Sequence, residues 1–356
     1  MERFLEVSKN GRVFGLDLLR SIAILLVLLA HGDFLLERNF PNYHGIWIID
    51  GVDVFFVLSG FLIGGILLKE FSKGLGQIHV FTFWKRRWYR TLPNYFLVLV
   101  LLIAINILWL KNNACGPQLW KYFLFAQNLL YPVGSFFPES WSLSVEEWFY
   151  IFLPLLCIIL TVITKNFVRS FLLTALLLIT FSLSYKIYKS FQFIPDFGVY
   201  DQYFKKVVVA RLDSLAMGVL GAYWLFSFPQ NFFSSKYFKF WAGIVLIIIS
   251  IVYPFNQLKL ILNSFMFSAG VLLCFPLCAS LKEYPRYLGD GILYISVISY
   301  SLYLFHFSIV MWFLVGVDVY SSTFGTIWHY LLYFLLSFIL STINYKYFEL
   351  FFLKRR

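Results

Sequence analysis

Charged residues are scarce in this sequence. Asp, Glu, Lys and Arg make up only 13% of its 356 residues, whereas 60% are hydrophobic and 22% are aromatic. A soluble globular chain carries about 25% charged residues. Because a soluble domain of this length cannot bury so much apolar surface, the composition excludes an ordinary soluble enzyme and predicts a membrane protein.

Cysteine is also rare, and its spacing indicates no site. The four cysteines are Cys115, Cys157, Cys274 and Cys278, and they form no pattern typical of a metal or redox centre. Three of them lie in apolar segments, where a thiol behaves as a small hydrophobic side chain. We therefore expect neither a metal site nor a disulfide.

We also expect no cleavable signal peptide. The first apolar run follows Asp17 and Arg20, is as long as a full span, and has no small-residue cleavage site after it. Since a span needs about 20 apolar residues, we expect about ten membrane helices, of which this run is the first. The apolar segments are 14–34, 46–68, 92–110, 141–163, 169–186, 206–227, 238–254, 259–281, 290–316 and 324–347. The predicted fold class is all-α, a polytopic membrane helix bundle with one domain over residues 1–356.

Residues 118–140 are the least regular part of this pattern. The stretch is aromatic but only moderately apolar, and Pro132, Gly134 and Pro138 interrupt it. We predict a re-entrant or interfacial segment, which a membrane tolerates only where it is buried in protein or faces water. Its rings suit either an outer platform for a sugar acceptor or an interfacial aromatic belt.

Basic residues outnumber acidic ones, which gives a formal net charge of +11. They lie mostly in short loops between apolar runs, where they set topology, so we expect no nucleic-acid partner. On a ten-span chain they share one face, which the positive-inside rule makes cytoplasmic. We therefore expect both termini inside and a multi-pass membrane protein. These residues are Arg3, Lys9, Arg12, Lys69, Lys73, Lys85, Arg86, Arg87, Arg90, Lys165, Arg169, Lys236, Lys239, Lys282, Arg286, Lys354, Arg355 and Arg356.

The first span carries Arg20 and His31, and ionisable groups inside spans indicate functional sites. Eleven residues of helix rise roughly 16 Å over about three turns, so both side chains share one face. The alternative is a snorkelling Arg and a His at the outer interface.

The second span contains Asp53 near its start, followed by Gly60, Gly64 and Gly65. The glycines allow close helix contact. Asp53 is placed to orient a His and stabilise its protonated form, or alternatively to begin a helix. Farther along, Arg211 and Asp213 interrupt an apolar span, and we expect them to pair.

The basic cluster from Lys85 to Arg90 lies on the predicted cytoplasmic side. Arg87 and Arg90 are three residues apart and would point to one side of a helix. Paired guanidinium groups suit phosphate, which they bind bidentately. Topology determination or anionic-lipid contact explains the cluster equally well.

The fourth span opens with Trp141-Ser-Leu-Ser-Val-Glu-Glu-Trp-Phe-Tyr150. Two adjacent carboxylates at a membrane boundary are unusual. Ser142 and Glu146 share one helix face, and Glu147 lies on the next.

Together these segments resemble the acyltransferase-3 family of membrane O-acyltransferases. Each motif alone is weak evidence for the family, but the motifs occur in order along nearly the whole chain. The matching motifs are Arg20 with His31, Gly51 to Phe61, Arg87 and Arg90 with Pro93 and Tyr95, Trp141 to Tyr150, Arg211 to Ser214, Ser299 to His306, and Tyr347 to Glu349.

The resemblance implies a ten-helix membrane fold and an acyl-CoA donor, usually acetyl-CoA. It implies transfer to a carbohydrate or another extracytoplasmic acceptor, and a place in the bacterial inner membrane. Many members add a C-terminal hydrolase-like domain. We expect none here, so that the membrane part or a separate partner would complete the transfer.

The mechanism that we expect makes His31 the general base for the attacking hydroxyl. Asp53 or Glu147 would stabilise its imidazolium form, and Arg20 would continue an anion path or orient the thioester. Direct transfer and an acyl-enzyme both stay open. The predicted catalytic residues are His31, Arg20, Asp53, Glu146, Glu147 and Ser142, and the predicted CoA-binding residues are Arg87, Arg90, Arg86 and Lys85.

Other functions fit part of the pattern. Intramembrane charges also suit a transporter or flippase for a lipid-linked glycan, which would predict an inverted repeat that the sequence does not show. A scaffold protein and another class of membrane acyltransferase are further alternatives. We expect the acceptor to be lipopolysaccharide O-antigen or another surface polysaccharide, lipid-linked or exported, with peptidoglycan and small glycosides also open.

Overall fold

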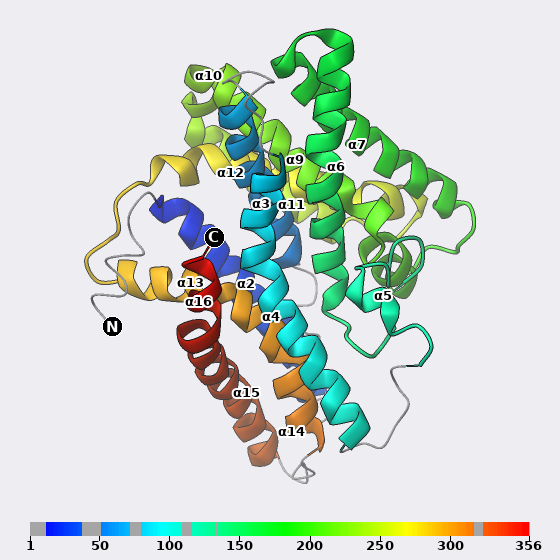
Figure 1. The fold of residues 1–356 in the computed structure, drawn as a ribbon, viewed down its shortest axis with the longest axis vertical. Helices are drawn as coiled ribbons and strands as arrows, with labels where there is room; N and C mark the ends of the chain where they lie inside the picture. Colours follow the sequence, from blue (N-terminus) through cyan, green and yellow to red (C-terminus); the bar gives the residue numbers. More distant parts are fainter. Residues whose placement is uncertain are drawn as a thin grey trace.

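The computed structural model describes residues 12–37, 51–71, 80–108, 116–132, 134–316 and 323–355, and the regular elements in these ranges are all helices. The long helices pack side by side into one bundle (Figure 1). They are α2 (Phe14–Glu37), α3 (Gly51–Phe71), α4 (Val80–Leu108), α6 (Ser140–Thr164), α7 (Phe167–Ser190), α9 (Val208–Ser227), α11 (Lys236–Val252), α12 (Gln257–Ser280), α13 (Gly289–Phe305) and α15 (Thr323–Asn344). Shorter elements are α5 (Trp120–Phe123), α8 (Phe197–Val199), α10 (Pro229–Phe233), α14 (Trp312–Gly316), α16 (Leu350–Leu353) and the π-helical turns η2 (Tyr200–Lys205), η3 (His306–Met311) and η4 (Tyr345–Glu349).

Nine helices of the described ranges are long and apolar enough to cross a membrane. The predicted polytopic helical bundle is therefore confirmed, and the chain is a multi-pass membrane protein. The predicted segment 238–254 corresponds to α11, which has 17 residues and packs along α12. A helix of this length rises about 25 Å, slightly less than the ~30 Å hydrocarbon core.

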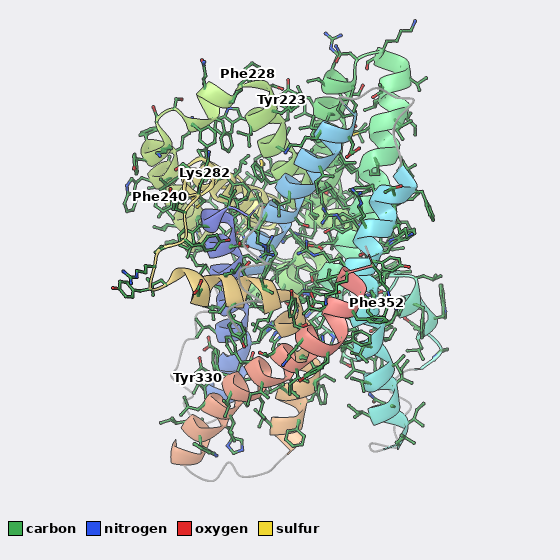
Figure 2. The ribbon with its side chains drawn as sticks, turned by 60° about the vertical axis from the view of Figure 1, so that its left-hand side comes forward. Tyr223, Phe228, Phe240, Lys282, Tyr330 and Phe352 are labelled. Atoms are coloured by element: carbon green, nitrogen blue, oxygen red, sulfur yellow. The ribbon has the colours of Figure 1, made fainter. Side chains whose placement is uncertain are left out.

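The outer surface of the bundle is apolar. Side chains such as Val100, Ile107 and Trp241 are more than half exposed. Aromatic side chains also mark both ends, with Phe228 near one end and Tyr330 near the other (Figure 2). Such a surface suits a lipid environment with aromatic belts at its boundaries.

The helix α4 begins earlier than the sequence predicted. We expected an apolar segment over 92–110 with the basic cluster in the preceding loop, but the helix starts at Val80 and contains both the cluster and Pro93. Trp84 donates a hydrogen bond of 2.9 Å from Nε1 to the Tyr150 carbonyl on α6. This tertiary contact holds the first turns of α4 in place, which puts the cluster on a rigid element.

Two glycines let α3 and α9 touch backbone to backbone. A Cβ atom on Gly60 would lie 1.9 Å from the Leu215 carbonyl oxygen, and one on Gly218 would lie 2.0 Å from that of Val57. The predicted close contact is confirmed for Gly60 and for Gly64, whose added Cβ would meet the Ala222 side chain at 2.9 Å. Gly65 has no atom within 4 Å of that position, so it does not take part.

Buried ion pairs join the helices around this contact. We expected Arg211 to pair with Asp213, and this prediction is wrong. Arg211 on α9 pairs with Asp53 on α3, while Asp213 pairs with Lys186 on α7 at 2.6 Å. All four side chains are buried. Because residues two apart on a helix point to different sides, each finds its partner on another helix.

The irregular stretch 116–140, described apart from residue 133, packs against α4 and α6. Tyr95 donates to the Tyr122 carbonyl at 2.8 Å, and Trp148 donates to the Phe125 carbonyl at 3.0 Å. The Asn128 amide donates to the carbonyls of Trp141 and Lys206. Side chains of α4 and α6 thus satisfy two of its carbonyls, and burial against protein is the condition for irregular backbone at membrane depth.

Candidate functional site

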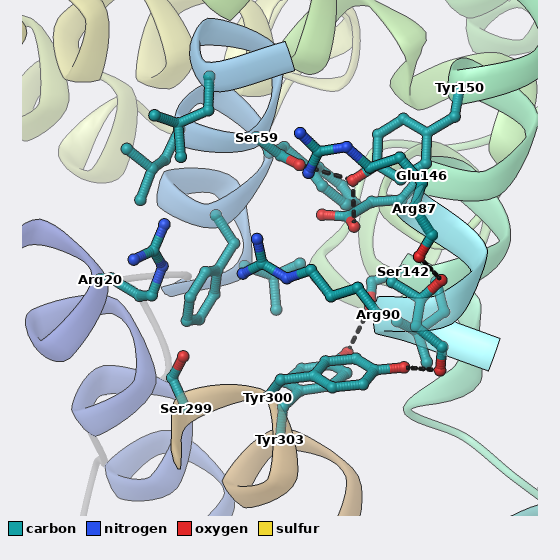
Figure 3. A pocket seen from close by; sticks show the side chains of 17 residues that line it. Arg20, Ser59, Arg87, Arg90, Ser142, Glu146, Tyr150, Ser299, Tyr300 and Tyr303 are labelled. Atoms are coloured by element: carbon teal, nitrogen blue, oxygen red, sulfur yellow. Dashed lines mark hydrogen bonds between the residues drawn. The ribbon is translucent and has the colours of Figure 1, made fainter. Parts of the chain in front are cut away.

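Three arginines from distant segments converge on one cavity inside the bundle. The cavity holds about 100 Å³ and lies among α2, α3, α4, α6 and α13. Arg87 and Arg90 reach in from α4 toward Arg20 on α2 (Figure 3). Ser142, Glu146, Tyr150, Ser299, Tyr300 and Tyr303 supply the other polar side chains of its wall. The cavity therefore combines three cationic side chains with several hydroxyl groups and the carboxyl group of Glu146.

Arg20 is held in place by Asp17, three residues earlier on the same helix. Its Nη1 donates to Asp17 Oδ1 at 2.9 Å and to Ser296 Oγ at 3.2 Å. Asp17 also accepts hydrogen bonds from Ser296 at 2.6 Å and from Tyr284 at 2.5 Å. The buried carboxylate offsets part of the local positive charge and fixes the guanidinium at the cavity wall.

The basic cluster divides into two faces of α4. Arg87 and Arg90 line the cavity, whereas Lys85 and Arg86 are exposed and Lys85 lies over the Tyr89 ring. Arg20, Arg87 and Arg90 also line a neighbouring cavity of about 860 Å³, to which Arg12 and Lys69 contribute. Basic residues from two segments predicted to be cytoplasmic, the N-terminal tail and the connection after the second span, thus meet at this cavity. Of the four predicted CoA-binding residues, Arg87 and Arg90 face the cavity, whereas Lys85 and Arg86 point away from it.

The two glutamates of α6 have different surroundings. Glu146 lines the cavity and accepts a hydrogen bond of 2.6 Å from Tyr150, whose hydroxyl also contacts Ser59 at 2.7 Å. Glu147 is turned toward α4, where it accepts from Thr91 at 2.7 Å. One turn earlier, Ser142 contacts the Tyr303 hydroxyl at 2.6 Å on the cavity wall. The structure therefore places Glu146 and Ser142 at the site, and Glu147 beside it.

His31 lies in a second cavity of about 240 Å³. Its Nδ1 is 2.7 Å from Nε2 of His306, the first residue of η3. We expected Asp53 or Glu147 to contact His31, but the structure pairs these carboxylates with Arg211 and Thr91 instead. The imidazole partner of His31 is a second histidine.

The charged groups around the second cavity come from η2, from Lys206 directly after it, and from the residue before α6. Asp201 forms ion pairs with Lys205 and Lys206, and all three line the cavity. Glu139 is buried and accepts hydrogen bonds from Ser308 N at 3.0 Å and Ser308 Oγ at 2.5 Å. Burial raises the pKa of Glu139 to about 7, although these hydrogen bonds oppose the shift. The exposed rings of Phe34 and Phe197 complete the wall.

The three cavities lie in series through the bundle. The cavity of about 860 Å³ shares Arg20, Leu62, Arg87 and Arg90 with the cavity of about 100 Å³, here called the arginine cavity. The arginine cavity in turn shares Val52 with the second cavity, here called the His31 cavity. Chemically, this arrangement offers anion binding at one end and a base at the other. Within the described residues, no group of three or more His, Cys, Asp or Glu side chains is arranged to hold a metal ion.

Sequence reasoning missed several of these residues as parts of the site. Asp17 could have been found, because its spacing of three from Arg20 puts both on one helix face. Tyr303 and His306 lay in a recognised motif but received no role. Glu139 and Ser59 gave no local signal, since only the packing of distant helices brings them to the cavities.

The chain matches one protein family and several named proteins. Residues 13–346 match the family model described as an acyltransferase domain. A Staphylococcus aureus protein provisionally named as an O-acetyltransferase is 32% identical over 201 residues, which cover 52% of this chain and 31% of that protein. The peptidoglycan O-acetyltransferase OatA of Listeria monocytogenes is 29% identical over 164 residues, which cover 42% of this chain and 25% of that protein. The chain thus spans a third or less of the length of these relatives. No solved structure matches the chain.

Proposed function

The chain belongs to the acyltransferase-3 family, and we propose that it is a membrane O-acetyltransferase that moves an acetyl group from acetyl-CoA to a hydroxyl of a surface carbohydrate. The observation that carries this proposal is the series of cavities. It has three arginines at one end and His31 at the other. An anionic donor and a neutral hydroxyl acceptor need these two environments.

The arginine end is the donor site in this proposal. The guanidinium groups of Arg87 and Arg90 hold the CoA phosphates, since charge-assisted bidentate contacts are the strongest that a phosphate makes. Arg20, fixed by Asp17, extends the cationic wall toward the thioester. The positive-inside rule makes this end cytoplasmic, where CoA is found.

The pantetheine arm must then cross the bundle toward His31. Arg20 and His31 lie eleven residues apart on α2, which is roughly 16 Å along the helix axis. The hydroxyl oxygens of Ser142, Tyr150 and Tyr303 line the intervening cavity and accept hydrogen bonds from the amide N–H groups of the arm. The thioester carbonyl would lie near Val52, where the arginine cavity and the His31 cavity meet.

The His31 cavity is the acceptor site. His31 takes the proton from the sugar hydroxyl as that hydroxyl attacks the thioester carbonyl, which is general-base catalysis. Rings such as Phe34 and Phe197 offer apolar faces to a sugar, and the charged groups of η2 offer hydrogen bonds. The name of the Listeria relative favours a peptidoglycan acceptor, beside the O-antigen or other polysaccharide expected from the sequence.

Deletion of the gene in a bacterial host tests this function. Proton NMR of the purified surface glycans follows the O-acetyl signals, with complementation by the wild-type gene and by His31→Ala. We expect one O-acetyl signal to disappear and to return with the wild-type copy alone, and the sugar resonances that shift with it identify the acceptor. Glycans that keep all their acyl groups would overturn the carbohydrate acceptor and favour a transporter.

A further inference from the structure

The ring of His306 is anchored by the backbone of its own helix. Its Nδ1 lies 2.7 Å from the Tyr303 carbonyl oxygen and 3.0 Å from that of Leu302. A carbonyl oxygen only accepts hydrogen bonds, so Nδ1 of His306 must carry a hydrogen. His306 is fully buried at the start of the π-helical turn η3, and such turns are frequent at functional sites.

The two imidazole rings meet edge to edge. Their planes differ by 15° and their centroids are 4.9 Å apart, while His31 Nδ1 and His306 Nε2 are separated by 2.7 Å. The centroid distance is close to the sum of this hydrogen-bond length and the two ring radii. Both nitrogen atoms therefore lie close to the line that joins the ring centroids, near their in-plane lone-pair and N–H directions.

The tautomers follow from these contacts. A neutral His306 with its hydrogen on Nδ1 has a lone pair on Nε2, which can only accept. His31 must then donate from Nδ1, which leaves the lone pair of His31 on Nε2. The Nε2 atom of His31 is the one that is available to take a proton.

We propose that His306 is the positioning residue of His31, and that it selects the tautomer in which His31 Nε2 is the base. This inference rests on the proposed acetyl transfer. It gives a buried histidine the orienting role that a carboxylate has in the familiar serine-hydrolase triad.

The carboxylates near His31 are engaged elsewhere in the described chain. Both oxygens of Glu139 accept from Ser308, and Asp201 pairs with Lys205 and Lys206. Asp33 lies two residues farther along α2 and also has an interaction partner. An uncharged residue suits the position of His306 beside His31, because a buried carboxylate at that position would need a positively charged partner.

The proton balance of the step is simple. The acceptor oxygen forms a bond to the thioester carbonyl carbon, and its proton passes to His31 Nε2. The carbon–sulfur bond then breaks, and the proton on His31 passes to the departing CoA sulfur, which leaves as the thiol. His31 keeps its Nδ1–H bond to His306 throughout, and the carbonyls of Leu302 and Tyr303 stabilise positive charge that spreads onto the second ring.

Nitrogen-15 NMR of the wild-type protein tests the tautomers without reference to catalysis. The chain has five histidines, so ring-labelled protein gives few signals, which His31→Gln and His306→Gln variants assign. We expect both residues to be protonated at Nδ1 only, with scalar coupling between His31 Nδ1 and His306 Nε2. Protonation of His31 at Nε2 would overturn the inference even if the protein is an acetyltransferase.

Two neutral amides give a matched kinetic test. The side-chain amide of His306→Gln reaches the position of Nε2 and offers an oxygen to His31, whereas that of His306→Asn reaches only the position of Nδ1. We expect His306→Asn to lower kcat about 100-fold, and His306→Gln to stay within about 10-fold of wild type, with little change in KM for either substrate. Equal losses in the two variants, or losses in KM, would show a merely structural role. A wild-type protein with the expected tautomers but no acetyl transfer would overturn the proposed function and leave the hydrogen-bond geometry standing.

Discussion

Asp53 on α3 forms a buried ion pair with Arg211 on α9, at the interface where Gly60 and Gly218 bring the two helices into contact. Both side chains are almost fully buried, and Arg211 also donates to Ser214 and lies over the Phe56 ring. The pair therefore joins α3, which lines the arginine cavity, to α9, which lines the neighbouring cavity of about 860 Å³. Its first role is to hold these two helices together.

Neutralising one partner of this pair should destabilise the protein. Asp53→Asn leaves the Arg211 charge buried without its counter-ion, which costs about 3–5 kcal/mol. Asp53→Asn/Arg211→Gln removes both charges and should recover more than half of that loss. Thermal unfolding in detergent measures both variants. A stable but inactive Asp53→Asn protein would instead support a catalytic Asp53.

The contact between α3 and α9 predicts a contrast between two glycines of one helix. Gly60→Ala must push the Leu215 carbonyl away and should cost about 1–3 kcal/mol or more. Gly65→Ala meets open space and should stabilise the helix by up to about 1 kcal/mol. Unfolding temperatures of the two variants provide the comparison. Similar changes in both would contradict the close packing.

The two faces of the basic cluster predict a difference in donor binding. Arg87→Gln and Arg90→Gln each remove a charged hydrogen-bond donor worth about 1.5–3 kcal/mol, so the KM for acetyl-CoA should rise about 10- to 100-fold. Arg86→Gln, which changes an exposed side chain of the same helix, should stay within about 2-fold. Initial rates at varied acetyl-CoA concentration measure all three. An equal effect of Arg86→Gln would indicate that the cluster acts through general charge alone.

Glu139 predicts how stability depends on pH. Burial raises its pKa from an ordinary value of 4.5 to about 7. Its contribution to stability is therefore present in full below about pH 4.5 and is lost as the pH rises through 7. Between pH 5 and pH 8 the wild type should lose about 1–3 kcal/mol that Glu139→Gln does not lose, because glutamine resembles the protonated acid. Melting curves at several pH values test this, with the exposed Glu283→Gln as control, and an unchanged pH dependence in Glu139→Gln would refute it.

Local patterns of the sequence predicted much of the fold and several of the residues that line the candidate site. Apolar runs located the helices, and helical spacing correctly put Arg87 and Arg90 on one face. The long-range pairs were not predictable, since nothing in a local pattern says that His31 meets His306, 275 residues away, or that Arg211 prefers Asp53 to Asp213. The start of α4 was missed for the same reason, because the hydrogen bond between Trp84 and α6 extends that helix.

The most direct test of the account is acetyl transfer by the purified protein in liposomes. Acetyl-CoA carrying a labelled acetyl group is supplied on the face that exposes Arg87 and Arg90, and a glycan acceptor is supplied on the opposite face. The account predicts labelled ester on the glycan with the wild-type protein and a loss of at least about 100-fold in rate with His31→Ala, which inserts normally. Transfer by His31→Ala at the wild-type rate would contradict it, as would a wild-type protein that leaves the glycan unlabelled.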